Sequence, residues 1–259
     1  MTEGDPFFDA EGRPQVLAGV AIYSASPRFA ELAGRSGFDA VWIDMEHASL
    51  DLAGAEAMCV ATEAGGAVPI VRCMGYERDH ILRALEIGGR IIVCPMTNDA
   101  DAARKMVEYG KYRPLGRRGF YRYSRGLRFG QREDWLEQAN ARTVLLPQIE
   151  TLEAVRNIDG ILGVEGISGI LIGPGDLSAD MGKPGNFEDP ELVEMICECL
   201  RKARGAGRHA GILPPALSLM KRALAAGADL CVFASDLKPM LDGWQAGLET
   251  FRGLARKQA

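Results

Sequence analysis

The sequence predicts a (β/α)8 barrel of the TIM type, with residues 1–259 forming a single domain. Apolar, β-branched runs recur along the chain, and a segment with apolar residues at helical spacing follows each run. The runs are almost continuously apolar, as strands are when helices cover a parallel sheet. A chain of 259 residues has the length of one such barrel. A doubly wound open sheet shows the same alternation, and a count of strands does not exclude it.

Eight strands are predicted in order along the chain, at 16–23, 40–46, 68–73, 90–96, 143–150, 167–174, 209–213 and 230–235. Helical patterns lie between them, among others at 79–87, 99–109 and 190–206, and a helix at about 237–257 closes the chain. Glycines such as Gly37, Gly88 and Gly227 follow helical patterns, where a left-handed residue ends a helix.

One connection, 110–142, is much longer than the usual link between barrel elements. Arginines and aromatic residues alternate through it, from Tyr112 to Arg142. We interpret most of the segment as a subunit-contact loop whose arginines are solvated or paired with acids. The alternative is an electropositive lid over an anionic substrate, with one or two arginines reaching the site and selecting an acidic aldehyde.

Composition limits the partners that the protein can have. The net charge of −5 argues against nucleic-acid binding. No apolar stretch approaches the roughly 20 residues of a membrane span. The first residues are acidic and unlike a signal peptide. The six cysteines include no Cys-x-x-Cys pair and are expected to be reduced and buried, so we expect a cytoplasmic protein without membrane contact.

Two acidic residues end successive apolar runs, Glu150 after 145–149 and Asp176 after 169–175. The C-terminal ends of barrel strands point at the active site, so these acids can share one cation. Mg²⁺ and Mn²⁺ prefer oxygen ligands, and two carboxylates leave positions free for water and substrate. The alternative is helix capping, which suits Asp176 better than Glu150 because glutamate caps poorly.

His47 follows the second predicted strand, where a neutral imidazole can take or give a proton. The alternative is a structural histidine bonded to Asp44; His80 and His209 are interpreted as structural. Arg72 ends the third strand, and its guanidinium fork can bind carboxylate or enolate oxygens. An internal salt bridge to Asp44 or Glu46 is compatible with that role.

Two further residues accompany these groups. Gln148 lies two positions before Glu150 and therefore on the same strand face, where it can donate a hydrogen bond to a bound oxo acid. Gly175 has no side chain to block a ligand and offers its N–H to a carboxylate, although a tight turn also explains it.

Four motifs in this order resemble the HpcH/HpaI aldolase family over roughly residues 16–240: Trp-Ile-Asp-Met-Glu-His at 42–47, Val-Arg at 71–72, Pro-Gln-Ile-Glu at 147–150 and Ile-Gly-Pro-Gly-Asp-Leu-Ser at 172–178. The resemblance implies a (β/α)8 barrel and a class II aldolase that uses pyruvate as nucleophile with a divalent metal, Mg²⁺, Mn²⁺ or Co²⁺. It also implies a homo-oligomer, expected to be a hexamer, with the C-terminal helix packed on a neighbour.

Carried over by position, the resemblance assigns Glu150 and Asp176 to the metal. Arg72 then holds pyruvate and stabilises its enolate, and His47 transfers protons. Gln148, Gly175 and Leu213 surround the pyruvate. Glu86 stands where the family has the aspartate of a Leu-Asp-x-Gly motif, as a partner of the histidine. The chain departs from the family pattern at 88–90 and 120–128, so the second substrate is not carried over.

The resulting hypothesis is a metal-dependent carbon–carbon lyase that reversibly cleaves 4-hydroxy-2-oxo acids to pyruvate and an aldehyde. The predicted strands contain no lysine, which argues against a Schiff-base mechanism. The alternatives are a malyl- or citramalyl-CoA lyase, an oxaloacetate decarboxylase, and, less favoured, a barrel that only binds an oxo acid.

Overall fold

The computed structural model describes residues 4–131 and 134–256. Within these residues, eight parallel strands form a closed barrel in sequence order. The strands are β1 (Leu17–Ala21), β2 (Ala40–Asp44), β3 (Val68–Arg72), β4 (Ile91–Cys94), β5 (Val144–Ile149), β6 (Gly169–Ile172), β7 (His209–Ile212) and β8 (Leu230–Ser235). β8 pairs with β1, with Leu230 opposite Leu17, so no sheet edge remains open. The predicted barrel is confirmed, and the open sheet is excluded.

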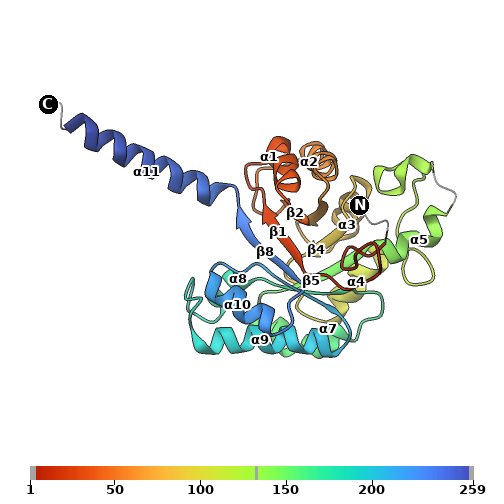
Figure 1. Ribbon diagram of the computed structural model, residues 1–259. Helices are drawn as coiled ribbons and strands as arrows, with labels where there is room; N and C mark the ends of the chain where they lie inside the picture. Colours follow the sequence, from red (N-terminus) through yellow and green to blue (C-terminus); the bar gives the residue numbers. More distant parts are fainter. Residues whose placement is uncertain (1–3, 132–133, 257–259) are drawn as a thin grey trace.

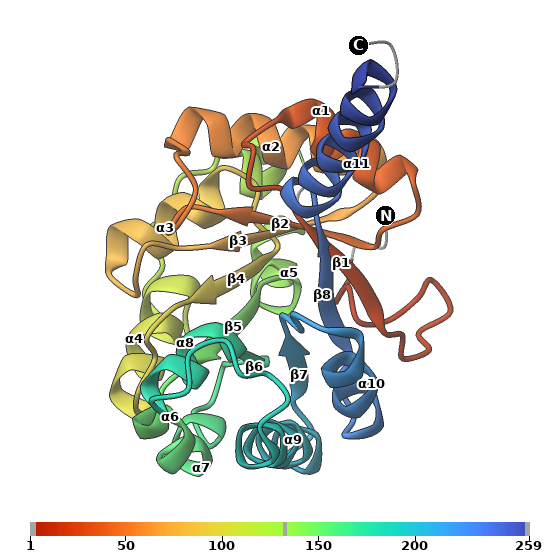
Figure 2. The ribbon, with the colours of Figure 1, turned by 90° about the vertical axis from the view of Figure 1, so that its left-hand side faces the viewer.

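Helices follow the strands and form the outer layer, which Figure 2 shows around the ring of strands. They are α1 (Pro27–Arg35), α2 (Leu52–Gly65), α3 (Arg78–Glu86), α4 (Ala100–Gly110), η1 (Arg125–Gly130, a 3-10 helix), α5 (Trp135–Arg142), α6 (Leu152–Arg156), α7 (Ile158–Leu162), α8 (Pro174–Asp180), α9 (Pro190–Gly205), α10 (Leu217–Ala225) and α11 (Leu237–Arg256).

The alternation of side chains along each strand divides the apolar core in two. Outward-facing residues such as Val41 and Val71 pack against the helices. Inward-facing residues such as Trp42, Ile70 and Leu146 fill the barrel itself. Because the interior is filled below the strand ends, the inner face of the strands is open to a small molecule only above this filling, at the mouth.

The opposite end of the barrel is closed by the N-terminal segment. Phe7 is buried and stacks on the His209 ring at the start of β7, with 3.7 Å between ring centroids. The His209 ring also lies 2.8 Å from Asp229 and 3.3 Å from Asp5. Burial alone would lower the pKa of His209, but the two aspartates outweigh it and raise the pKa to about 9. His209 is structural, as predicted.

Helix α11 continues directly from β8 and projects away from the barrel (Figure 1). None of its residues is buried. Apolar side chains recur every three or four residues along it and are exposed, namely Leu237, Leu241, Trp244, Leu248 and Phe251. This spacing gives one apolar stripe that the rest of the chain leaves uncovered.

All six cysteines lie in the described part of the chain, and they are free and buried. Among the described helices, none is long and apolar enough to cross a membrane.

Candidate active site

The mouth of the barrel carries polar groups on the inner face of the strands. Asp44 ends β2, Arg72 ends β3, and Gln148 lies near the end of β5, followed by Glu150. All four are buried. Because alternate residues of a strand share a face, these groups continue the inward-facing rows that hold Trp42, Ile70 and Leu146 deeper in the barrel.

Arg72 is held on two sides by acids. Its Nε donates to Asp44 Oδ1 at 3.0 Å and its Nη2 donates to Asp44 Oδ2, while its Nη1 lies 3.0 Å from Glu46 Oε2. The guanidinium carbon stands 5.2 Å from the Trp42 ring centroid. Burial alone would raise the pKa of Asp44, but the hydrogen bond from Arg72 outweighs it and the pKa is lowered. The predicted internal salt bridge is therefore present, and it fixes a planar cation at the mouth.

Asp44 also sets the turn that follows β2. Its Oδ1 accepts the backbone N–H groups of Glu46 at 2.9 Å and His47 at 3.1 Å. The turn leaves the His47 side chain 61% exposed, with Nε2 3.9 Å from Glu46 Oε2. The imidazole is therefore available to a molecule bound at the mouth, and its contact with Asp44 is made through its backbone.

Glu150 is buried with both carboxylate oxygens engaged. Oε1 accepts the Met96 N–H at 2.6 Å and Oε2 accepts from Gln148 Nε2. Burial, together with the negative charges of Asp176 and Glu46, raises the pKa of Glu150 to about 7, although the Met96 hydrogen bond opposes the shift. Thr151, and not Glu150, caps α6. Capping therefore does not explain a glutamate at this position.

Asp176 lies in the first turn of α8 and is exposed at the mouth. The helix cap is Gly173, so Asp176 is not an N-cap either. A Cβ at Gly173 would stand 2.9 Å from both Gln148 Nε2 and Glu150 Oε2, so only glycine lets α8 start this close to the acids. A Cβ at Gly175 would meet nothing within 4 Å, which leaves the space beside it open. Leu213 follows β7 and is half-buried.

These residues fit a hard divalent cation. Glu150 and Asp176 bring negative charge together. Burial is the main cause of the raised pKa of Glu150, and the charges of Asp176 and Glu46 add a repulsion that a cation would relieve. Gln148 Oε1 is buried and has no hydrogen-bond partner among the described residues, so one more oxygen is free to interact. No group of three or more His, Cys, Asp or Glu with metal-binding geometry occurs in residues 4–131 and 134–256. The donor set is thus two carboxylates, which suits a metal that keeps water or substrate oxygens.

The structure does not bring Glu86 to His47 within one chain. Glu86 is the last residue of α3, and α3 leads into the start of β4, whereas His47 follows the end of β2. The two ends of a parallel barrel lie on opposite sides, so the expected pairing of His47 with Glu86 does not form here. The charged neighbour of Glu86 is instead Arg118.

The long segment 110–142 is likewise not a lid over its own mouth. It joins α4 to β5 and so follows a helix, which places it at the end of the barrel where strands begin. Figure 1 shows α5 on the opposite side of the barrel from α8. Arg125 pairs with Glu63 on α2, so the interpretation of arginines paired with acids holds for this residue.

Sequence reasoning missed the roles of three residues at the site. The sequence predicted Asp44 as a partner of Arg72 or His47 and Glu46 as a partner of Arg72, yet Asp44 also shapes the turn and Glu46 adds charge beside Glu150. Tyr23, after β1, was not considered. Burial raises its pKa, and Asp44 raises it further, so its hydroxyl faces the Arg72 cluster. The dense run Asp44-Met-Glu-His47 at a strand end was the available signal for the first two.

The closed barrel with an acid-rich mouth around a fixed arginine defines a (β/α)8-barrel enzyme. The sequence matches the HpcH/HpaI aldolase/citrate lyase family over residues 18–242. The chain belongs to this family, and it is an aldolase-type lyase.

Individual relatives agree with this assignment. The 2-keto-3-deoxy-L-rhamnonate aldolase of Escherichia coli O17:K52:H18 is 34% identical, over 96% of this chain and 93% of the relative. The structure of a family protein from Burkholderia cenocepacia J2315 superposes with a TM-score of 0.85 at 27% identity, covering 92% of this chain and 95% of the other. Citrate synthase SbnG superposes with a TM-score of 0.83 at 26% identity, covering 93% and 95%.

Proposed function

We propose that the protein is a divalent-metal-dependent lyase that reversibly cleaves 4-hydroxy-2-oxo acids to pyruvate and an aldehyde. The observation that carries the proposal is the meeting of Glu150 and Asp176 with the fixed guanidinium of Arg72 at one mouth. The relatives whose names specify a 2-keto-3-deoxy sugar acid support a 2-oxo acid as the substrate class. Glu150 and Asp176 would hold the metal, which supplies Lewis-acid polarisation of the 2-oxo group when bound.

Arg72 binds and stabilises the reacting part of the substrate. When the C3–C4 bond breaks, its electrons move onto C3 and the 2-oxo oxygen, giving an enolate. The guanidinium donates N–H groups to the oxygen that gains this charge. Asp44 and Glu46 hold Arg72 in place beforehand, so little reorganisation accompanies the reaction.

His47 moves the protons. It accepts the proton of the 4-hydroxyl group as the aldehyde carbonyl forms, and a proton returned to C3 of the enolate completes pyruvate. Its exposure at the mouth places the imidazole where substrate enters. Glu46, 3.9 Å away, stabilises the imidazolium that forms in between.

A metal-removal experiment tests the proposal. Cleavage of a 4-hydroxy-2-oxo acid, followed by pyruvate release, should stop after treatment with EDTA and return with Mg²⁺, Mn²⁺ or Co²⁺. The Glu150→Gln and Asp176→Asn variants should not regain cleavage activity when the metal is added. Full turnover by a sample verified to be metal-free would refute metal dependence. Oxaloacetate, malyl-CoA and citramalyl-CoA belong in the same assay panel, because faster turnover of one of them would replace the proposed substrate class.

We propose further that the protein assembles as a homo-oligomer, a hexamer, through α11. The supporting observation is the exposed apolar stripe on this helix, which a monomer would leave in water. Its partner is then a second copy of the chain, and its small-molecule partners are an oxo acid and an aldehyde.

A further inference from the structure

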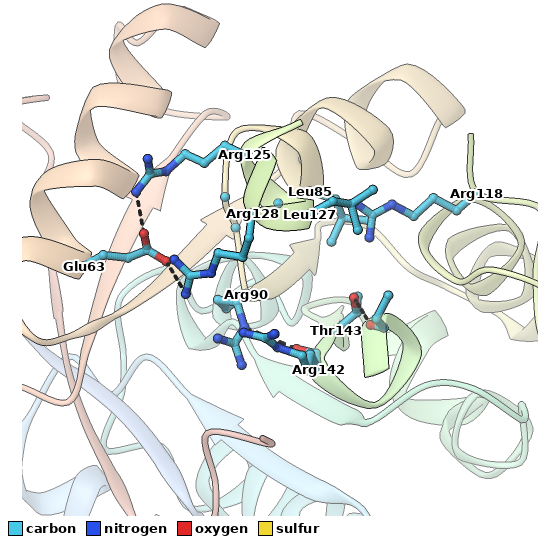
Figure 3. Close-up of a pocket in the computed structure, with 13 residues that line it drawn as sticks. Glu63, Leu85, Arg90, Arg118, Arg125, Leu127, Arg128, Arg142 and Thr143 are labelled. Atoms are coloured by element: carbon cyan, nitrogen blue, oxygen red, sulfur yellow. Dashed lines mark hydrogen bonds and ion pairs between the residues drawn. The ribbon is translucent and has the colours of Figure 1, made fainter. Parts of the chain in front are cut away.

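A cavity lies at the end of the barrel opposite the mouth, and arginines dominate its lining. It is bounded by the ends of α2 and α3, the start of β4, η1 and the end of α5 (Figure 3). Its charged lining residues in the described part of the chain are Arg90, Arg118, Arg125, Arg128, Arg142 and Glu63. We call this set the arginine cavity. Among the described residues, Glu63 is the one acid that lines the cavity, and it pairs with Arg125 and Arg128 and not with Arg118 or Arg90.

Arg118 shows most clearly that the positive charge of the cavity lacks an anionic partner within the described chain. It is buried, with 7% of its surface exposed, and among the described residues its Nε and Nη2 have no hydrogen-bond partner. The guanidinium rests over the Tyr112 ring, 4.9 Å from its centroid. In Figure 3 it points toward Leu127, in the middle of the lining residues. Glu86 is the acid whose charge acts on Arg118, but no hydrogen bond joins them among the described contacts, and a buried guanidinium with unused donors is unfavourable unless an anion accepts from it.

Arg125 and Arg128 approach from the other side and share one acid. Arg125 Nη2 pairs with Glu63 Oε2, and Arg128 Nη2 lies 3.5 Å from Glu63 Oε1. Arg125 Nε is buried without a partner in the part of the chain that is described. One carboxylate therefore neutralises two guanidinium groups only in part, and donors of Arg125 remain unused.

Arg90 adds further positive charge from the start of β4. Its Nη2 donates to the Gly4 carbonyl at 2.8 Å, and its Nε lies 3.4 Å from the Arg142 carbonyl, so both contacts are to neutral groups. Burial, together with the charges of Arg142 and Arg128, lowers the pKa of Arg90 to about 10. The arginines thus repel one another across the cavity.

We propose that the arginine cavity is a binding site for a compact, multiply charged oxyanion of the phosphate type. Guanidinium groups bind such anions through paired N–H donors. Arg118 and Arg125 each have a buried guanidinium N–H without a partner among the described residues, and Arg128 lines the same cavity. The site is distinct from the mouth, because the elements that line it meet at the starts of β4 and β5, whereas the mouth lies at the ends of the strands.

Binding would also tie together parts of the chain that are distant in sequence. Glu63 lies two residues before the end of α2, Arg90 immediately precedes β4, and Arg128 lies in η1. Arg128 and its neighbour Phe129 have positive φ angles of 53° and 54°, a strained backbone for residues other than glycine. An anion held between Arg118 and Arg128 therefore stabilises a segment that otherwise carries strain, and binding should raise the thermal stability of the whole protein.

The test measures binding of inorganic phosphate to the intact protein by calorimetry and by thermal unfolding, at constant ionic strength against chloride. At a hundredfold excess over Kd, phosphate should raise Tm by about 5–10 °C. Arg128→Gln, whose side chain is 40% exposed and tolerant of change, should weaken binding about tenfold or more. Arg118→Met should do the same, and Arg128→Gln keeps the test valid if the buried variant does not fold.

Arg117→Gln is the matched control, because Arg117 is the neighbouring arginine but points away from the arginine cavity and is 77% exposed. It should bind phosphate as the wild type does. Because the mouth also carries Arg72, binding in the wild type alone does not locate the site; the difference between Arg128→Gln and Arg117→Gln does. No phosphate binding by the wild type, or equal binding by these two variants, overturns the proposal.

Discussion

At the mouth, Arg72 and His47 lie on neighbouring strand ends but in opposite surroundings. Arg72 is buried and held by two acids, whereas His47 is exposed beside one. A fixed buried cation is suited to stabilising charge that develops in the transition state. An exposed imidazole is suited to proton exchange with bound substrate. Substitution of Arg72 and substitution of His47 should therefore affect catalysis in different ways.

Exchange of pyruvate methyl protons with D₂O separates these roles, since it needs enolate formation but no aldehyde. Arg72→Ala should slow exchange by about 10²–10³-fold, and Arg72→Lys should rescue poorly because a point charge cannot replace the fork. His47→Ala should slow exchange by about 10²–10⁴-fold while pyruvate binding persists. Wild-type exchange and cleavage in His47→Ala would make this histidine structural.

Gly173 gives a second prediction at the residue scale. In Gly173→Ala the new methyl would press on Gln148 and Glu150, destabilising the fold by about 1–3 kcal/mol and weakening metal binding by about 10–100-fold. Metal titration followed by calorimetry measures this. Gly205→Ala is the control, because a Cβ there meets nothing within 4 Å, and it should titrate like the wild type. Equal metal affinity in the two variants would contradict the steric argument.

At the scale of elements, α11 has a face with no partner in its own chain. Trp244 is the largest apolar side chain in the stripe and is 68% exposed. Trp244→Glu should dissociate the oligomer, since a central aromatic residue commonly contributes 2 kcal/mol or more to an interface. Light scattering at micromolar concentration measures the mass. Gln245→Glu, a neighbouring change outside the stripe, should leave the assembly intact, and a wild-type monomer would refute the proposed hexamer.

The order of strands and helices was predictable because each apolar run and each helical pattern is long enough to be recognised locally. Seven of the eight predicted strands were longer than those observed, as in 40–46 against Ala40–Asp44, where the last residues of the run leave the sheet to form the mouth; β8 has the predicted bounds. The placement of Glu86 was predictable in principle, because it is the last residue of a helix and therefore lies at the end of the barrel where the strands begin, opposite the mouth. The burial of Arg118, with Nε and Nη2 unpartnered among the described residues, was not predictable, because burial of an arginine depends on contacts between distant segments.

At the scale of the whole molecule, His209 makes stability depend on pH. Its pKa is about 6.5 when unfolded and about 9 when folded, so its charge stabilises the fold fully below pH 6.5 and progressively less up to pH 9. The side chain is 14% exposed, so screening is small, and the shift corresponds to a contribution on the order of 3 kcal/mol.

The His209→Gln variant tests this dependence. Urea unfolding should show it less stable than the wild type at pH 6, and the difference should narrow between pH 6.5 and 9. Both proteins must be measured at the same concentration, because assembly also contributes to stability. A difference that stays constant across this range would mean that packing on Phe7, and not charge, explains the role of His209.

The contact of Asp5 and Phe7 with His209 also fixes an order of events during synthesis. The residues in the contact between Asp5 and His209 are 204 positions apart. At roughly 5–20 residues per second, the early segment waits about 10–40 s before its binding partner has been made. During that time the Phe7 ring has no core to enter. The closed end of the barrel consequently cannot form before β7 has been made, and a nascent chain halted before residue 209 presents an open barrel floor to chaperones and proteases.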